Sequence, residues 1–262
     1  MRMTHRLSQS FSKGRIVVAL LTICASLTVI TVAVEADTPM TAAQYQANPQ
    51  VMIDAYRHVE VASVSDAMEQ LLHEKRYMTH NMQAIFPTKF AGVALTVKLV
   101  KEENHDPHAL DGMLKAIDSG AAGSVYVMKI QDGADIAGMG GLMGTAMLAR
   151  DFAGAVVDGG VRDIPQLTKI GFPVYALGPV PSTSVGHYRF DGANIPIVCD
   201  GVPVSSGDII VADHDGVVVV PRAQASEILV RAQSLDFSEH SMYSFIEKYH
   251  SIEQAVQKFG RL

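Results

Sequence analysis

AGAVVDGGVRDIP, residues 153–165, is the stretch of this 262-residue sequence that decides the fold. Its apolar half, residues 153–157, does not alternate with polar residues, which predicts a short strand buried on both faces. A glycine turn follows, and Asp163 and Pro165 stand where a helix would begin. A buried strand that passes through a turn into a helix is typical of a parallel sheet, so the stretch predicts an α/β fold.

The same alternation of strand and helix extends outward along the chain. Single helices between strands imply right-handed crossovers and some parallel sheet. Ser63 and Asp66 are spaced as a capping box would be at the start of the first helix. We expect strands at residues 90–100, 124–130, 135–137 and 153–157, and helices at residues 63–77, 108–118, 145–150 and 164–170.

The pattern changes beyond Pro173, where short β-rich runs alternate with Gly, Pro, Asn and Asp. No helical pattern separates these runs, so we expect an antiparallel or barrel-like half. The runs are residues 174–177, 195–199, 208–212 and 217–220, and helical patterns follow at 223–233 and 237–259. The sequence thus predicts one α/β domain at residues 50–222, a linker at 37–49 before it and a C-terminal helical arm at 223–262.

The N-terminal segment is typical of an export address. Residues 1–15 carry basic side chains and no acidic one, and residues 16–34 contain no charge. This predicts a signal peptide at residues 1–36 and an exported protein, periplasmic or secreted. The apolar run is also long enough to span a bilayer, so a membrane anchor at residues 16–34 is the alternative. A membrane is a partner only if the segment stays uncleaved.

Composition excludes several classes of protein. Apolar residues make up 48% and charged residues 18%, which provides for a packed core and excludes a disordered chain. The net charge of −6 offers no basic field for nucleic acid. With two cysteines there is no disulfide framework and no Cys-rich metal site. Cys199, the cysteine outside the export segment, is expected to be buried and inert.

GMGGLMGT, residues 138–145, follows a short predicted strand and opens a helix. Glycines let a ligand approach the backbone, and a helix N-terminus offers unpaired N–H donors and partial positive charge for a carboxylate or phosphate. A dinucleotide fingerprint is excluded because its third glycine would fall on Met143, and no P-loop motif is present. The alternative is a tight turn with close packing between helix and strand.

Arg162 and Asp163 also allow two interpretations. Asp163 could cap the following helix, and Arg162 could be a solvated surface charge. However, parallel strands place ligand sites beyond their carboxyl ends, where both glycine stretches would lie. There Arg162 would bind a substrate carboxylate through its fork of donors, and Asp163 would hold a divalent metal.

Two further stretches look mainly structural. ADHDGVVVVP, residues 212–221, is a turn before a buried strand, and Asx-turn chemistry explains Asp213 and Asp215 without a metal. Residues 179–189 are irregular and contain His187 and Tyr188. His187 could be a general acid or base, but the sequence shows no partner for it.

Taken together, four motifs in register resemble the RraA-like family: VSDA at residues 64–67, GGLM at 140–143, DGGVRD at 158–163 and ADHDGVVVVP at 212–221. The resemblance covers residues 55–222. The family contains class II 4-hydroxy-4-methyl-2-oxoglutarate/4-carboxy-4-hydroxy-2-oxoadipate aldolases and regulators of ribonuclease E activity. It implies a swivelling β/β/α fold, a homotrimer or homohexamer, and active sites near subunit boundaries.

The resemblance also implies roles for particular residues. Arg162 would contact substrate as the catalytic arginine, and Asp163 would ligate Mg²⁺ or Mn²⁺. The activity implied is cleavage of a 4-hydroxy-2-oxo diacid to pyruvate and a second keto acid, with oxaloacetate decarboxylation as a side activity. The backbone clamp for the carboxylate of this small 2-keto acid would be Gly140, Gly141, Leu142 and Met143.

Two features depart from the family pattern, namely the export segment and residues 182–189, which match no known role. Two other functions compete with the lyase. The first is a non-enzymatic protein-binding regulator like the ribonuclease regulators, against which export argues because their target is cytosolic. The second is a methyltransferase, against which the failed glycine spacing argues.

Overall fold

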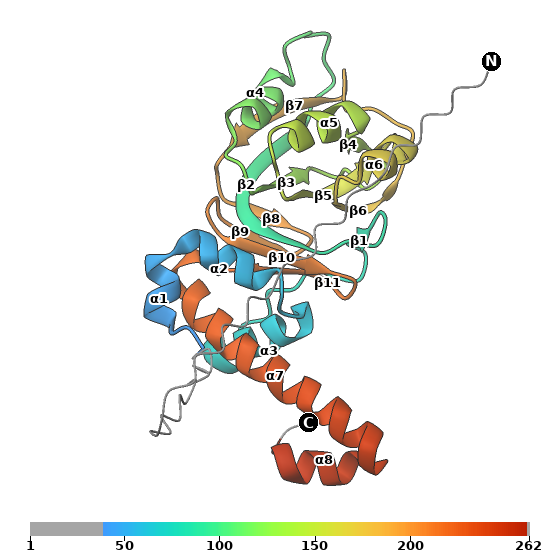
Figure 1. The fold of residues 1–262 in the computed structure, drawn as a ribbon. Helices are drawn as coiled ribbons and strands as arrows, with labels where there is room; N and C mark the ends of the chain where they lie inside the picture. The colour runs from blue at the N-terminus through green and yellow to red at the C-terminus, as the bar shows by residue number, and fades with distance from the viewer. Residues whose placement is uncertain (1–38, 261–262) are drawn as a thin grey trace, which may run out of the picture. The chain divides into compact units, whose positions relative to one another are not determined.

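A strongly curved sheet organises the chain in the computed structural model, which describes residues 39–260 (Figure 1). Its neighbouring strands run in the order β1-β6-β5-β3-β2-β10-β11, with β4 beside β5 and β7 beside β2. Strands β2 to β6 form the parallel part: β2 (Phe90–Lys101), β3 (Ser124–Ile130), β4 (Ala137–Met139), β5 (Gly154–Val161) and β6 (Val174–Pro179). The antiparallel strands are β1 (Gln83–Ala84), β7 (Tyr188–Ala193), β10 (Ile209–Asp213) and β11 (Gly216–Val220).

The sheet is nearly closed into a barrel by one short segment. Residues 76–78 bond the edge of β11, with the Met78 N–H donating to the Val217 carbonyl over 2.9 Å. The same segment then continues into β1, which pairs with β6 at the opposite edge of the sheet. The hairpin of β8 (Ile197–Cys199) and β9 (Val202–Val204) packs with the apolar residues on the inner side of the curve.

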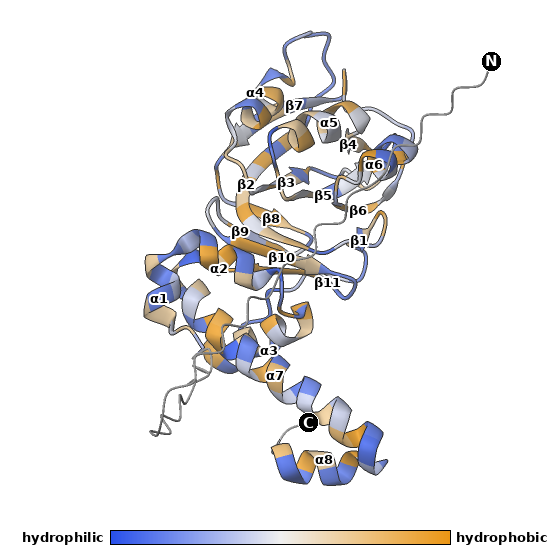
Figure 2. Cartoon of the chain, in the orientation of Figure 1, coloured by the Kyte–Doolittle hydropathy of each residue, from blue (hydrophilic) through white to orange (hydrophobic). Residues whose placement is uncertain are grey.

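Two groups of helices cover the outer side of the sheet. Helices α4 (Asp111–Ser119), α5 (Gly141–Ala149) and α6 (Ile164–Ile170) pack on the parallel strands. The β10–β11 end is covered by the other group: α1 (Ala42–Ala47), α2 (Pro49–Tyr56), α3 (Val61–Leu72) and α7 (Ala225–Tyr249), the last preceded by a 3₁₀ turn (Arg222–Gln224) and followed by α8 (Ile252–Phe259). Figure 2 shows apolar residues along the strands and polar residues on the outer surfaces of the helices.

These elements confirm the predicted α/β class and the mixture of parallel and antiparallel strands. Strands were predicted correctly at residues 90–100 and 124–130, as were the helices near 108–118 and at 164–170. The predicted glycine turn at residues 158–160 is wrong, because β5 runs on to Val161. A Cβ at Gly160 would lie 2.0 Å from Val180 Cγ1, so glycine is needed there for close packing within the sheet.

The capping box predicted for Ser63 and Asp66 is also wrong. Helix α3 begins two residues earlier, at Val61, and ends at Leu72. The N–H of Val61 donates to Asp213 Oδ2 over 2.9 Å, so the first turn is satisfied by a residue distant in sequence. Ser63 lies inside the helix and is buried.

Both predicted flanking segments differ from expectation. The linker at residues 37–49 contains α1, which begins with a capping box between Thr41 and Gln44. The predicted C-terminal helices are present, but helix α7 is continuous through residues 234–236, and Ile228, Leu229 and Ala232 in its first half are buried in the core. Helix α7 ends instead at Tyr249, and His250, which follows it, has a left-handed backbone conformation.

The predicted export segment, residues 1–36, lies outside the described residues. Within residues 39–260, no helix combines the length and the apolar character that a membrane span requires.

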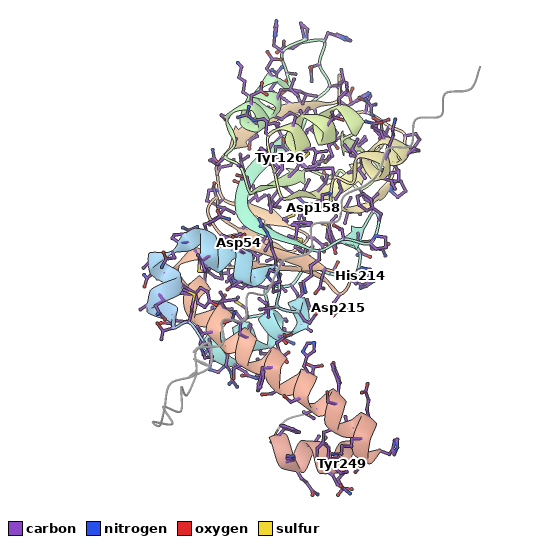
Figure 3. The ribbon with its side chains drawn as sticks, viewed as in Figure 1. Asp54, Tyr126, Asp158, His214, Asp215 and Tyr249 are labelled. Atoms are coloured by element: carbon purple, nitrogen blue, oxygen red, sulfur yellow. The ribbon has the colours of Figure 1, made fainter. Side chains whose placement is uncertain are left out.

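Tyr126, labelled in Figure 3, offers a test of how the core is packed. It is fully buried on β3, and within residues 39–260 its hydroxyl has no hydrogen-bond partner, whereas the buried Tyr56 hydroxyl donates to the Ala225 carbonyl over 2.6 Å. An unpaired buried hydroxyl costs stability, so Tyr126→Phe should leave the free energy of unfolding unchanged or raise it by about 1 kcal/mol. Tyr56→Phe should lower it by about 1 kcal/mol. Urea denaturation checks this, and equal losses in both variants would contradict it.

Candidate active site

Asp163 follows the end of β5 and precedes α6, as the sequence predicts, but its side chain does not cap that helix. The residue has a left-handed backbone conformation, with φ 59° and ψ 38°. Aspartate tolerates this conformation better than most residues. Its Oδ2 accepts the N–H of Gly141 over 3.0 Å. The carboxylate therefore faces the first turn of α5 instead of its own helix.

Glycine at position 140 makes this approach possible. A Cβ there would lie 2.5 Å from Asp163 Oδ2 and 3.0 Å from Arg162 Cγ. Gly144, one turn further, faces Leu167 of α6 just as closely. The glycines of α5 thus bring its N-terminus against both Arg162 and Asp163. The helix begins at Gly141, four residues before the predicted start at residue 145, and it places N–H groups where an anion would bind.

Gly140→Ala should lower any activity of this site about tenfold without unfolding the protein. The added methyl would overlap the Asp163 carboxylate, which must then rotate away, and small displacements of positioned groups cost rate. The measurement is kcat/KM together with the melting temperature. Gly201→Ala is the control: Gly201 has a positive φ like other turn glycines, open space around it and no contact with the site. The Gly201→Ala variant should lower the melting temperature and leave kcat/KM unchanged. Equal activity losses in both variants would contradict the assigned cradle.

Arg162 is held beside this carboxylate by two contacts. Its Nε lies 3.9 Å from Asp163 Oδ2, and its Nη1 donates to the Ser182 carbonyl over 3.3 Å. Its own N–H donates to the Met139 carbonyl, which ties the end of β5 to β4. The side chain is 45% exposed, so the guanidinium has donors left for a ligand.

Ser182 has structural contacts beside this candidate site that the sequence did not reveal. Its Oγ donates to the Asp135 carbonyl over 2.9 Å and accepts the N–H of Ala137 over 3.0 Å. These bonds fasten the segment after β6 to the start of β4 and so fix the carbonyl that Arg162 contacts. No sequence signal could have found it, because Ser182 and its partners are more than forty residues apart.

A cavity of about 170 Å³ opens beside these residues. It brings together both predicted groups of residues: Gly140, Leu142 and Met143 line it with Arg162 and Asp163. Leu142 is 90% exposed, so its side chain points away from the protein. Gly141 lines an adjoining hollow together with Asp163. The other lining residues are Met113, Leu114, Ala137, Gly138, Met139, Thr183, Ser184 and Val185.

The charges of the cavity suit a hydrated divalent cation better than a closed metal site. Asp163 is the one carboxylate among the described residues that line it. Across residues 39–260, no group of three or more His, Cys, Asp or Glu side chains is arranged to hold a metal. Magnesium is commonly held by one or two carboxylates, with water and substrate oxygens as its other ligands. The half-exposed Asp163 carboxylate fits this mode of binding, and the site does not fit structural zinc.

The structure does not bring His187 and Tyr188 to this cavity. His187 Nδ1 lies 2.8 Å from Glu103 Oε2, and the Tyr188 hydroxyl donates to the Gln131 carbonyl over 2.9 Å. His187 therefore contacts the loop after β2, and Tyr188 contacts the turn after β3.

The turn between β10 and β11 is structural at Asp213, as predicted. The N–H of Asp215 donates to Asp213 Oδ1 over 3.0 Å, which is an Asx turn. His214 and Asp215, labelled in Figure 3, line a separate hollow of about 820 Å³. Its other lining residues include the segment that closes the sheet between β11 and β1. Cys199 is buried as predicted, and burial raises the pKa of its thiol well above the usual value, so the thiol is unreactive.

Comparisons with known proteins identify similar sequences and structures. Residues 61–219 match the family described as RraA-like, Aldolase/RraA. A protein of Halalkalibacterium halodurans named "Putative 4-hydroxy-4-methyl-2-oxoglutarate aldolase" is 29% identical over 186 residues, which are 69% of this chain and 81% of that protein. The 4-hydroxy-4-methyl-2-oxoglutarate aldolase of Thermus thermophilus is 27% identical over 133 residues, 51% of this chain and 76% of the relative.

Solved structures share the fold. An uncharacterized protein of Pseudomonas syringae superposes with a TM-score of 0.72 at 27% identity, covering 84% of this chain and 96% of that one. Streptomyces coelicolor RraAS2, described as an unusual member of the RNase ES inhibitor RraA protein family, has a TM-score of 0.65 at 25% identity and covers 75% of this chain and 96% of its own.

Proposed function

The chain belongs to the RraA-like family, and from this membership and the geometry around Asp163 we propose that it is a divalent-metal-dependent carbon–carbon lyase. Its substrate would be a 4-hydroxy-2-oxo diacid of the 4-hydroxy-4-methyl-2-oxoglutarate type, cleaved to pyruvate and a second keto acid. One observation supports this most: the Arg162 guanidinium and the Asp163 carboxylate face the first turn of α5 across glycines that have no side chain to block them.

Binding of the pyruvyl end is the first task of these residues. Arg162 would donate to the substrate carboxylate through its free donors, and the N–H groups in the first turn of α5 would add to this. The Gly141 N–H already donates to Asp163. Within the predicted clamp, the N–H groups of Leu142 and Met143 would therefore bind the substrate. Asp163 would hold Mg²⁺ or Mn²⁺, which when bound supplies Lewis-acid polarisation of the 2-keto oxygen.

Cleavage requires charge stabilisation and one proton acceptor. The C4 hydroxyl loses its proton, and its oxygen forms the carbonyl of the second keto acid. The bond between C3 and C4 breaks, and the electron pair of that bond passes to the pyruvyl fragment, which is then protonated at C3. Arg162 would stabilise the negative charge that develops on this fragment. No His or Lys is among the described lining residues, so water is the proton carrier in this proposal. Decarboxylation of oxaloacetate produces the same fragment and is the expected side activity.

RraA-like proteins are oligomeric, and we propose a homotrimer or homohexamer with the site near a subunit boundary. The exposed Leu142 and Val185 beside the cavity are the kind of apolar surface that a neighbouring subunit covers. We also propose that residues 1–36 direct the export of the protein. A non-enzymatic regulator is the competing function, and a pure protein that binds a protein partner but releases no pyruvate would favour it.

Removing divalent metal should abolish pyruvate release and leave the melting temperature unchanged. The Asp163 carboxylate would be the metal's protein ligand, so metal binding should contribute little to the free energy of unfolding. The test is a coupled pyruvate assay on 4-hydroxy-4-methyl-2-oxoglutarate with EDTA-treated protein, before and after Mg²⁺ or Mn²⁺ is added back. Full activity of the metal-free protein would contradict metal dependence, and a lowered melting temperature would indicate a structural metal.

A further inference from the structure

The cavity beside Asp163 has two chemically different ends. Helix α5 packs against α6 on one side and α4 on the other (Figure 1). The α6 side carries Arg162 and Asp163, which are the charged residues among the described lining residues. The α4 side carries four apolar side chains, which we call the far wall: Met113 and Leu114 of α4, Met143 of α5, and Val185 of the segment after β6. The hydroxyl residues Thr183 and Ser184 precede Val185 and also line the cavity.

The reacting atoms fix how a substrate would lie between these two ends. This step rests on the proposed function, which places C1 to C3 of the substrate at Arg162 and Asp163. C4 and its substituents then extend past the N-terminus of α5, toward the far wall. The two substrates named for aldolases of the RraA-like family differ only in the branch on C4. In 4-hydroxy-4-methyl-2-oxoglutarate this branch is a methyl group, and in 4-carboxy-4-hydroxy-2-oxoadipate it is a carboxymethyl group.

We propose that the far wall receives the C4 branch and selects methyl over carboxymethyl. A methyl group contacts Met113, Leu114 and Met143 favourably, whereas a carboxylate there loses hydration, and no cationic side chain is among the described residues of the far wall. The selection is moderate, since Leu114 is 46% exposed and water still reaches a charged branch. We therefore expect kcat/KM to favour the methyl substrate about tenfold.

Substitution at Leu114 tests the wall directly. It lies on helix α4 and is half-exposed, so lysine is accommodated there without damage to the core. Leu114→Lys should raise kcat/KM for the carboxymethyl substrate and remove or reverse the preference. Leu114→Gln, polar but uncharged, should not raise it. Leu148→Lys is the matched control, because Leu148 is a similarly exposed leucine of α5 that does not line the cavity.

A binding measurement separates this inference from the proposed function. Citramalate and citrate carry the same two C4 branches but lack the keto group, so neither is cleaved. In metal-free buffer, calorimetry should show tighter binding of citramalate by the parent protein and a gain for citrate in Leu114→Lys. Equal or tighter citrate binding by the parent overturns the selection even where pyruvate is released. Pyruvate release from neither substrate overturns the proposed function, and preferential citramalate binding would then still support the far wall as the branch site.

Discussion

Asp163→Asn should lower metal-dependent pyruvate release about a thousandfold or more, with little change in stability. Asparagine tolerates the left-handed conformation that position 163 requires, and its side-chain oxygen can still accept the Gly141 N–H. The substitution therefore removes the negative charge and keeps the local structure. Without that charge no described residue lining the cavity offers an anionic ligand for a divalent cation, and the chemistry that the cation supplies is lost.

The measurement is kcat at saturating Mg²⁺, with Mg²⁺ affinity determined by calorimetry and the melting temperature as the control for folding. Asp163→Ala is informative beside it, since it removes both the charge and the hydrogen bond to Gly141. It should lose activity to the same extent and also lose about 1 kcal/mol of stability. Activity of Asp163→Asn within tenfold of the parent would show that the metal is held elsewhere.

Arg162→Lys should lower kcat/KM about a hundredfold even though it keeps the positive charge. Lysine has a single ammonium group and cannot donate two parallel hydrogen bonds to a carboxylate. It also lacks the planar group that contacts both the Ser182 carbonyl and Asp163 in the parent. A group that stabilises charge in the transition state typically contributes a factor of this size.

The loss should appear in kcat as well as KM, since Arg162 is proposed to act on the developing charge and not on binding alone. Steady-state kinetics over a range of substrate concentrations separates the two. Ser182→Ala provides a comparison: it weakens the anchoring of the segment that Arg162 contacts, and it should raise KM more than it lowers kcat. A fully active Arg162→Lys would mean that no bidentate contact is made.

The proximity of the residues in the candidate site could be predicted from the sequence because it depends on local signals. A continuous apolar run predicts a buried parallel strand, and such strands place their carboxyl ends at a common edge. The Arg162–Asp163 pair and the glycines at 140–141 therefore had to lie close together once strand and helix were identified. The sequence did not predict the hydrogen bond between Asp163 and Gly141, because it offered Asp163 only as a metal ligand or as a helix cap.

Features that depend on tertiary contacts were missed or misread. Gly159 and Gly160 resemble a turn in sequence, but they lie in β5 because Ile130 and Val180 pack against them. Helix α3 begins at Val61 because a carboxylate more than 150 residues away satisfies its first N–H. The far wall and Ser182 come from segments whose proximity to Asp163 is set by the packing of α4 on α5 and by the path of the chain after β6.

A crystal structure of the protein with Mn²⁺ and oxalate, an analogue of the negatively charged pyruvyl fragment, tests the central claim most directly. An anomalous difference map should show manganese at the Asp163 carboxylate, with oxalate contacting both the metal and the Arg162 guanidinium. Manganese bound elsewhere, or an empty cavity between Gly140 and Asp163 at saturating ligand, would contradict the assignment of this site.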